Sequence, residues 1–74
     1  MVAMNRLSPK KLVRSKWTAV QPQNREKHFL VTAVQDDDEG QPQTVTLEAV
    51  HSHRERQLHW RELRDPGQWK SGWV

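Results

Sequence analysis

The chain of 74 residues contains no cysteine, tyrosine or isoleucine, and only three glycines. Without cysteine, disulfide bonds, thiol catalysis and cysteine-based zinc sites are excluded. No run approaches the roughly 20 apolar residues of a membrane-spanning helix, so we expect no membrane partner. The first six residues lack the apolar core of a signal peptide, and we therefore expect a cytoplasmic location. Because Gly40, Gly67 and Gly72 are scattered, the sequence has no glycine-rich loop for phosphates.

Tryptophan, by contrast, occurs four times in a chain whose apolar residues amount to only 34%. A domain of this size buries about 60% of the surface that its unfolded chain exposes, so its core is thin. Each indole ring can bury about 150–250 Å², which makes the tryptophans the largest source of core area. We expect the core to be formed by Trp17, Phe29, Leu47 and Trp60.

Charge is distributed unevenly along the chain. Residues 1–34 carry seven lysines and arginines against Glu26 alone, whereas residues 36–39 are four consecutive acidic residues. The net charge of +3 therefore hides a basic first half and an acidic segment. Such a distribution predicts a dipolar surface with a basic patch for a polyanion near the N-terminus, although charge runs also occur on ordinary solvated surfaces and acidic runs in loops.

Apolar and polar residues alternate with a period of two in residues 16–20, 28–34, 44–51 and 57–61. Alternation with valine, threonine and aromatic residues is typical of half-buried strands. The pattern predicts an all-β fold, a four-stranded antiparallel meander or small open barrel, with turns at residues 21–24, 36–40 and 52–55. The residues expected on the core face are Trp17, Ala19, Phe29, Val31, Ala33, Val45, Leu47, Ala49, Leu58 and Trp60.

The chain divides into two parts. Residues 1–9 show no periodicity and are predicted to be a flexible basic N-terminal arm, and residues 10–74 are predicted to form a single small β domain. Residues 10–15 fit either a brief helical turn or an extended lead-in.

The predicted inward residues are odd-numbered in residues 44–51 and even-numbered in residues 57–61. Inward residues can lie opposite one another only if the loop between these strands has an even number of residues. Residues 52–55 contain no glycine or asparagine for a two-residue turn, so a loop of four residues is expected. The resulting register pairs Leu47 with Trp60, Ala49 with Leu58, and Glu48 with His59.

The last ten residues show a different pattern. Asp65 followed by Pro66 is typical of a helix N-terminus, and Gly72 is placed where a helix would end. The sequence predicts a short helical turn between them that carries Trp69 and Trp73 on one side and covers the open face of the sheet.

Several strings resemble a family of small bacterial tryptophan-rich proteins of uncharacterised function. The resemblance covers about residues 8–74 and implies a stand-alone bacterial cytoplasmic domain, but it transfers no catalytic or binding residue. The strings that carry it are residues 15–20, 25–29, 47–50 and 60–63, and the closing Trp69, Gly72 and Trp73.

The sequence contains only weak signals of a catalytic or metal site. His51 and His53 with Glu48 or Glu55 form a possible zinc-ligand set, but a solvated hairpin tip is a poorly preorganised site. No serine lies in the setting of a nucleophile. We therefore expect no metal, no cofactor and no enzymatic activity, and a polar outer face for the histidines.

Two classes of binding function remain. A protein-interaction module, which includes a homodimer, is favoured by surplus aromatic area and open sheet edges. Binding of single-stranded DNA or RNA is the alternative, because basic grooves with exposed rings hold single strands. The expected polyanion-binding residues are Lys10, Lys11, Arg14, Lys16, Arg25 and Lys27. The expected interaction surface comprises Trp69, Trp73, Arg54, Arg56 and Arg61.

Overall fold

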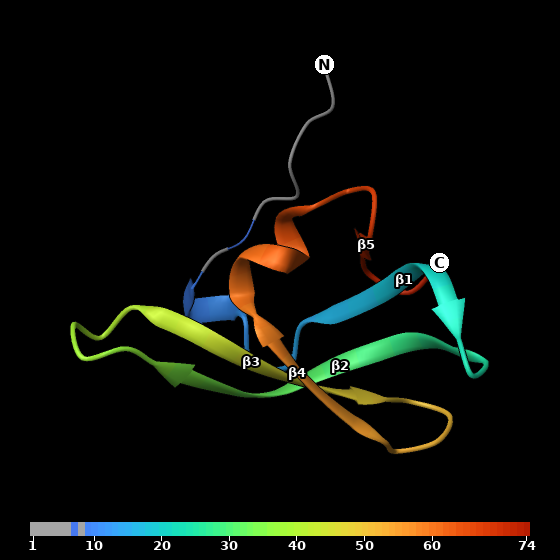
Figure 1. The fold of residues 1–74 in the computed structure, drawn as a ribbon, viewed down its shortest axis with the longest axis horizontal. Helices are drawn as coiled ribbons and strands as arrows, with labels where there is room; N and C mark the ends of the chain where they lie inside the picture. Colours follow the sequence, from blue (N-terminus) through green and yellow to red (C-terminus); the bar gives the residue numbers. More distant parts are fainter. Residues whose placement is uncertain (1–6, 8) are drawn as a thin grey trace.

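The computed structural model describes residue 7 and residues 9–74 as a five-stranded antiparallel sheet (Figure 1). The strand order is β4-β3-β2-β1-β5, which confirms the predicted all-β class. The elements in chain order are a 3-10 helix η1 (Pro9–Lys11), β1 (Lys16–Gln23), β2 (Glu26–Asp36), β3 (Pro42–Ala49), β4 (Glu55–His59), a second 3-10 helix η2 (Trp60–Arg64) and β5 (Trp69–Ser71).

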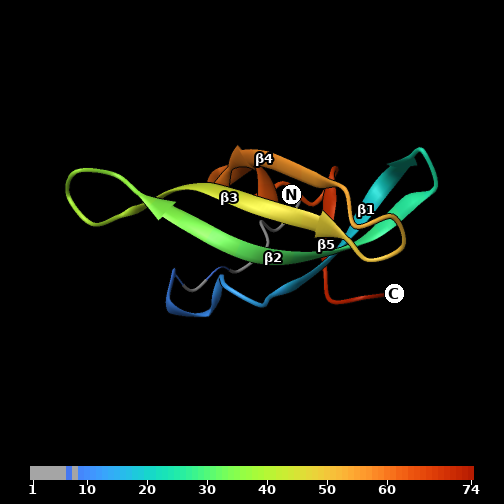
Figure 2. The same ribbon diagram turned by 90° about the horizontal axis from the view of Figure 1, so that it is seen from below.

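The molecule is flat, and the turns of its sheet gather at two opposite ends (Figure 1). The molecule measures 36 × 33 × 16 Å. The acidic β2–β3 turn forms one end, whereas the β1–β2 and β3–β4 turns lie together at the other end, near the last residue (Figures 1 and 2). The acidic turn thus lies opposite the turn that carries Arg25, whereas η1, with Lys10 and Lys11, lies on the side of the acidic turn (Figures 1 and 2).

One face of the sheet carries the core. Trp17, Phe29 and Leu47 are almost fully buried, as predicted, and Leu12 and Leu63 join them from outside the sheet. Alternation places the inward residues correctly in β3, where each predicted core residue is buried. Among the residues that the structure describes, the buried core comprises Leu12, Trp17, Ala19, Phe29, Val31, Val45, Leu47, Ala49, Leu58, Leu63 and Trp69.

A β-bulge interrupts the alternation in β2. The pairing with β3 shifts between Val31 and Ala33, after which Val34 lies opposite Val45. Ala33 is exposed and Val34 packs against the core. The prediction of Ala33 as a core residue is therefore wrong, because the bulge turns the following residues over.

The predicted register between β3 and β4 is also wrong, although inward residues do lie opposite inward residues, as in the pair of Val45 and Leu58. Leu47 lies opposite Arg56 rather than Trp60, and Glu48 lies opposite Glu55 rather than His59. The connection turns within residues 50–54, where His53 adopts a positive φ of 63°. This turn uses a left-handed residue, which the sequence does not predict because residues other than glycine adopt that conformation in only a few per cent of cases.

Trp60 does not extend β4, and its predicted place in the core is wrong. His59 ends the strand and caps η2. Its Nδ1 accepts from the Arg61 N–H at 3.2 Å, and the His59 N–H donates to the Glu62 carboxylate at 3.1 Å. This capping box starts a helix at the position where the alternation predicted one more strand residue. Trp60 is consequently half-buried at the margin of the core, and Leu63 enters the core instead.

The C-terminal helical turn predicted from Asp65 to Gly72 is replaced by a single turn and a strand. The Asp65 side chain accepts from the Gly67 N–H at 2.8 Å, and its carbonyl accepts from the Trp69 N–H at 3.0 Å. Trp69 then pairs with Ala19 as part of β5. The covering role predicted for this segment belongs to η2, which packs against β3, β4 and β5.

Most of the predicted N-terminal arm, namely residues 1–6 and residue 8, lies outside the described residues. Within the described part, Leu7 packs against the core. No helix of residues 7 and 9–74 is long and apolar enough to cross a membrane.

Candidate functional site

The C-terminal residues cross the face of the sheet opposite the core. Thr18 is flanked by two core residues, and its side chain therefore projects from the other face. Its hydroxyl donates to the Gly72 carbonyl at 2.7 Å and accepts from the Val74 N–H at 3.1 Å. The Gly72 N–H donates to the Lys16 carbonyl at 2.8 Å. These bonds hold Trp73 on the outer face.

Trp73 is fixed yet accessible. Its indole N–H donates to the Phe29 carbonyl at 2.9 Å, and the side chain of His28 lies beside it with a centroid separation of 6.1 Å. The Lys16 ammonium stands 4.7 Å from the ring centroid. Trp73 remains 42% exposed, whereas Trp17 and Trp69 are 2% and 3% exposed. Of the four tryptophans it is the exposed one, and its ring lies between the Lys16 ammonium and the His28 imidazole.

A shallow pocket adjoins this ring between the β1–β2 and β3–β4 turns. Its volume is about 490 Å³, and it is lined by Arg25, Lys27, His28, Val50 and His51. This lining contains no carboxylate. The basic aromatic face is defined here as Lys16, Arg25, Lys27, His28, His51 and Trp73.

The β1–β2 turn presents Arg25 in a conformation that glycine would adopt more easily. Gln23 pairs with Glu26, and the two residues between them, Asn24 and Arg25, have φ values of 55° and 63°. Two successive left-handed residues define a tight hairpin turn that favours Asn-Gly. An arginine at the second position costs about 1–2 kcal/mol relative to glycine. Strain of this kind is commonly retained where a side chain serves a function.

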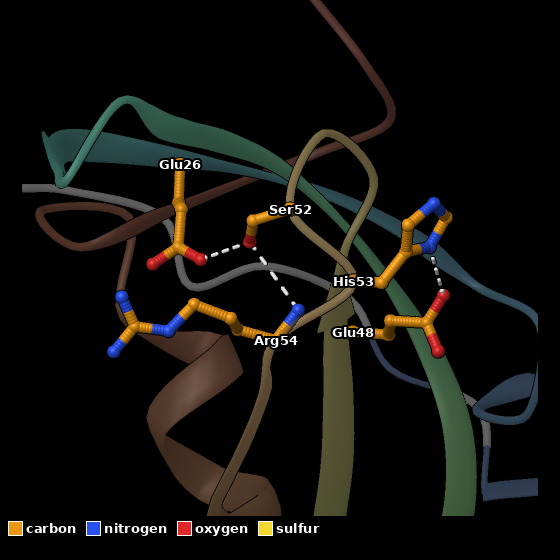
Figure 3. Close-up of polar contacts among 5 residues, drawn as sticks. All are labelled: Glu26, Glu48, Ser52, His53 and Arg54. Atoms are coloured by element: carbon orange, nitrogen blue, oxygen red, sulfur yellow. Dashed lines mark hydrogen bonds and ion pairs between the residues drawn. The ribbon is translucent and has the colours of Figure 1, made fainter.

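A partly buried polar contact joins the two turns. The Ser52 hydroxyl donates a short hydrogen bond to the Glu26 carboxylate, and the Arg54 N–H donates to the same hydroxyl at 3.2 Å (Figure 3). Glu26 is only 8% exposed. Its neighbours in sequence line the pocket on one side, and the residue before Ser52 lines it on the other.

The zinc-ligand set considered from the sequence is not assembled. His53 Nδ1 lies 3.1 Å from Glu48 Oε2, an exposed pair at the β3–β4 turn (Figure 3). Across residues 7 and 9–74, no three histidine, aspartate or glutamate side chains are grouped to hold a metal ion. The predicted cross-strand pair of Glu48 and His59 does not form, because His59 lies opposite Thr44.

The six predicted polyanion-binding residues fall into separate groups. Lys10, Lys11 and Arg14 precede β1, whereas Arg25 lies beyond its far end and Lys27 follows in β2. The Arg14 N–H donates to the Val31 carbonyl at 2.7 Å, and Lys27 lies four residues from Val31 along β2, so at about 3.3 Å per residue roughly 13 Å separates Arg14 from Lys27. Lys16 stands beside Trp73, so it lies with the exposed ring rather than with the lysines of η1.

The predicted interaction surface is not continuous either. Trp69 is buried and packs edge-on against Phe29 at 5.3 Å, so it offers no ring to a partner. The Arg56 guanidinium lies 5.8 Å from the Trp69 ring on the core side of the sheet. Arg61 lies beside Trp60 at 5.9 Å, in η2. Of the two tryptophans in the predicted surface, only Trp73 is exposed.

Two members of the basic aromatic face, His28 and His51, have little signal in the sequence. The sequence suggests only a metal-ligand role for His51 and none for His28, because their approach depends on the way the two turns meet. The hydrogen bond from the Val50 N–H to the His28 carbonyl, at 2.9 Å, places them in the same pocket. A contact between residues 22 positions apart has no local sequence signature.

Fold and site together define a small antiparallel β protein, rich in tryptophan, with a basic aromatic face at one end. The chain belongs to the family described as tryptophan-rich protein (DUF2389), whose model matches residues 15–74. This match confirms the resemblance seen in the sequence, and the function of the family is unknown. No curated protein and no solved structure matches the chain.

Proposed function

We propose that this protein is a non-enzymatic module that binds single-stranded nucleic acid on its basic aromatic face. The observation that carries the proposal is the placement of the exposed Trp73 ring beside Lys16 and the basic pocket. Single-strand binding proteins combine these two features, because a ring stacks a base of any identity and cations neutralise the phosphates.

The position of Lys16 over the ring is compatible with base stacking. An exposed cation–π contact contributes about 0.5–1 kcal/mol. A stacked base contributes about 1–3 kcal/mol, which exceeds that value. A base therefore displaces the flexible Lys16 side chain from the ring, and the ammonium becomes available to a neighbouring phosphate.

The acidic end of the molecule also favours binding of the nucleic acid at the basic aromatic face. Asp36, Asp38 and Glu39 are exposed in the β2–β3 turn, at the opposite end from the pocket (Figures 1 and 2). Their charge repels phosphates, so a strand is directed toward the turns that carry Arg25 and Lys27. We also propose a cytoplasmic location, as expected for a chain without cysteine.

A protein partner is the second candidate, and the exposed apolar side chains of the same region favour it. Val50 is 41% exposed and lines the pocket, Val74 is 65% exposed, and Trp73 lies between basic residues. An apolar patch with a basic rim suits an acidic protein surface. The open edges at β4 and β5 would also admit a second copy of the chain.

The test is a fluorescence anisotropy titration of a labelled mixed-sequence DNA strand of about 12 nucleotides. If three phosphates are contacted, raising the salt from about 50 to about 200 mM should weaken binding about 20-fold. Trp73→Ala should weaken binding about tenfold by removing the stacking platform.

A matched pair of variants separates specific from diffuse charge effects. Lys27→Gln removes a cation from the basic aromatic face, and Lys10→Gln removes one from η1, with the same change in net charge. Lys27→Gln should weaken binding several-fold more than Lys10→Gln. Equal effects, or no binding by the unaltered protein, would reject the proposal and direct attention to a protein partner.

A further inference from the structure

We propose that the pocket between the two turns is a phosphate subsite and that the hydrogen bond between Ser52 and Glu26 holds it in shape. This inference deepens the proposed function and rests on it in one respect: the phosphate is taken to belong to the nucleotide whose base stacks on Trp73.

The first argument is the convergence of cationic and hydrogen-bonding groups from separate elements. Arg25 and Lys27 reach the pocket from the β1–β2 hairpin, and His51 reaches it from the turn after β3. They supply guanidinium, ammonium and imidazole groups around a hollow with no carboxylate in its lining, and the His28 Nε2 beside them is hydrogen-bonded to the Val74 carbonyl at 2.9 Å. A tetrahedral oxyanion accepts hydrogen bonds from several directions, so it suits donors that arrive from different sides.

The second argument is that a hydrogen bond between residues outside the pocket lining connects the two walls of the pocket. Glu26 lies between Arg25 and Lys27 in sequence, and Ser52 directly follows His51. The short hydrogen bond between the Ser52 hydroxyl and the Glu26 carboxylate therefore fixes the separation of the two walls (Figure 3). Glu26 itself lines a different hollow, on the side of Phe29, so its charge lies outside the lining of the basic pocket.

The third argument is the arginine in the turn. Arg25 holds a left-handed φ of 63° in a turn that favours glycine at this position. The conformation directs a cation to the pocket at a cost in stability, which is consistent with a functional role for its side chain.

His28 links the pocket to the aromatic ring. It lines the pocket, and its ring lies 6.1 Å from the ring of Trp73. In a nucleotide, only the ribose separates base and phosphate. A base stacked on Trp73 thus places its own or the adjacent phosphate beside His28, at the pocket.

The experiment is a ¹H–¹⁵N NMR titration of the full chain with inorganic phosphate, adenosine and adenosine monophosphate, at matched ionic strength. Phosphate should shift the amide signals of Arg25, Lys27, His28 and His51. Adenosine should shift the indole signal of Trp73. Adenosine monophosphate should shift both sets and bind several-fold more tightly than either fragment.

Three variants locate the effect. Lys27→Gln should weaken phosphate binding about tenfold, the loss expected for one charge-assisted hydrogen bond. Ser52→Ala should weaken it several-fold while adenosine still shifts Trp73, because the link positions the walls without touching the base. Lys10→Gln, in η1, should leave phosphate binding unchanged. The dispersion of the amide signals shows whether each variant is folded.

The outcomes separate the two proposals. If phosphate produces no shifts at the pocket while DNA still shifts Trp73, the subsite is rejected and single-strand binding stands. If phosphate shifts the pocket but neither adenosine monophosphate nor DNA shifts Trp73, the subsite is supported and the nucleic-acid function is rejected. Equal weakening by Lys10→Gln and Lys27→Gln would overturn the subsite, since it would indicate diffuse attraction.

Discussion

Two tryptophans four positions apart in the chain occupy opposite environments. Trp69 is 3% exposed and packs edge-on against Phe29, whereas Trp73 is 42% exposed on the other face. The difference arises because β5 ends at Ser71 and Gly72 follows with a φ of 82°, a conformation that glycine adopts without strain. One ring thus fills the core, and the other remains available to a ligand.

Alanine substitution should separate these two roles. Trp69→Ala should lower the free energy of unfolding by about 3–5 kcal/mol, because it leaves a cavity in the core. Trp73→Ala should lower it by less, because 42% of this side chain is already exposed and only the covered part of the ring and its hydrogen bond to the Phe29 carbonyl are lost. Urea denaturation measures both values. Equal losses would contradict the assignment of Trp73 to an accessible face.

Trp60 provides an intermediate case. The alternation of the sequence places it in the core, where its removal would cost about 3–5 kcal/mol. Because the structure places it half-buried at the start of η2, Trp60→Ala should cost less than Trp69→Ala in the same urea experiment. A cost as large as that of Trp69→Ala would show that Trp60 belongs to the core after all.

At the scale of the element, alternation predicts a strand well only while the strand remains regular. It places Val45, Leu47 and Ala49 correctly in β3, which contains no bulge within that stretch. It fails at Ala33 because the bulge in β2 costs little and has no distinct sequence signal. It fails at Trp60 because the capping box of η2 competes locally with a further strand residue.

The C-terminal segment shows a different limit of prediction. Asp65 does begin a turn, as its side-chain bond to the Gly67 N–H shows. Whether the chain then continues as helix or strand depends on the free edge of β1, which accepts Trp69 opposite Ala19. The candidate site was missed in part for the same reason, because its pocket forms only where two distant turns meet.

The β1–β2 turn offers a test in which stability and binding change in opposite directions. Arg25→Gly should raise the free energy of unfolding by about 1 kcal/mol, because glycine adopts the left-handed conformation without strain. The same variant should weaken DNA binding several-fold, since it removes a cation from the pocket. Urea denaturation and anisotropy titration measure the two effects. A variant that is stabilised and still binds with full affinity would exclude Arg25 from the site.

The attachment of the C-terminal residues depends on Thr18. Its buried hydroxyl satisfies both the Gly72 carbonyl and the Val74 N–H. Thr18→Val keeps the shape but leaves these groups without their partner, which should cost about 1–3 kcal/mol. The Trp73 indole signal should also lose its distinct chemical shift in the NMR spectrum. An unchanged signal would show that the hydrogen bond to the Phe29 carbonyl alone orients the ring.

At the scale of the whole molecule, a thin sheet separates its core from its binding surface by using both faces. Trp17 and Phe29 fill one face, which η2 covers, and Trp73 crosses the other. The long axis separates the acidic β2–β3 turn from the basic end (Figure 1). A ring that fills the core cannot also stack a base. Placing the core rings on one face and Trp73 on the other lets a short chain have both a core and an accessible ring.

The most direct test of this account is a ¹⁵N NMR titration of the protein with a mixed-sequence single-stranded oligonucleotide, at about 50 mM and about 200 mM salt. The four tryptophan indole signals report on the rings separately. The account predicts a shift of Trp73 at the lower salt that is largely lost at the higher salt, with Trp17 and Trp69 unchanged. A well-dispersed spectrum in which Trp73 does not respond at either salt would contradict it.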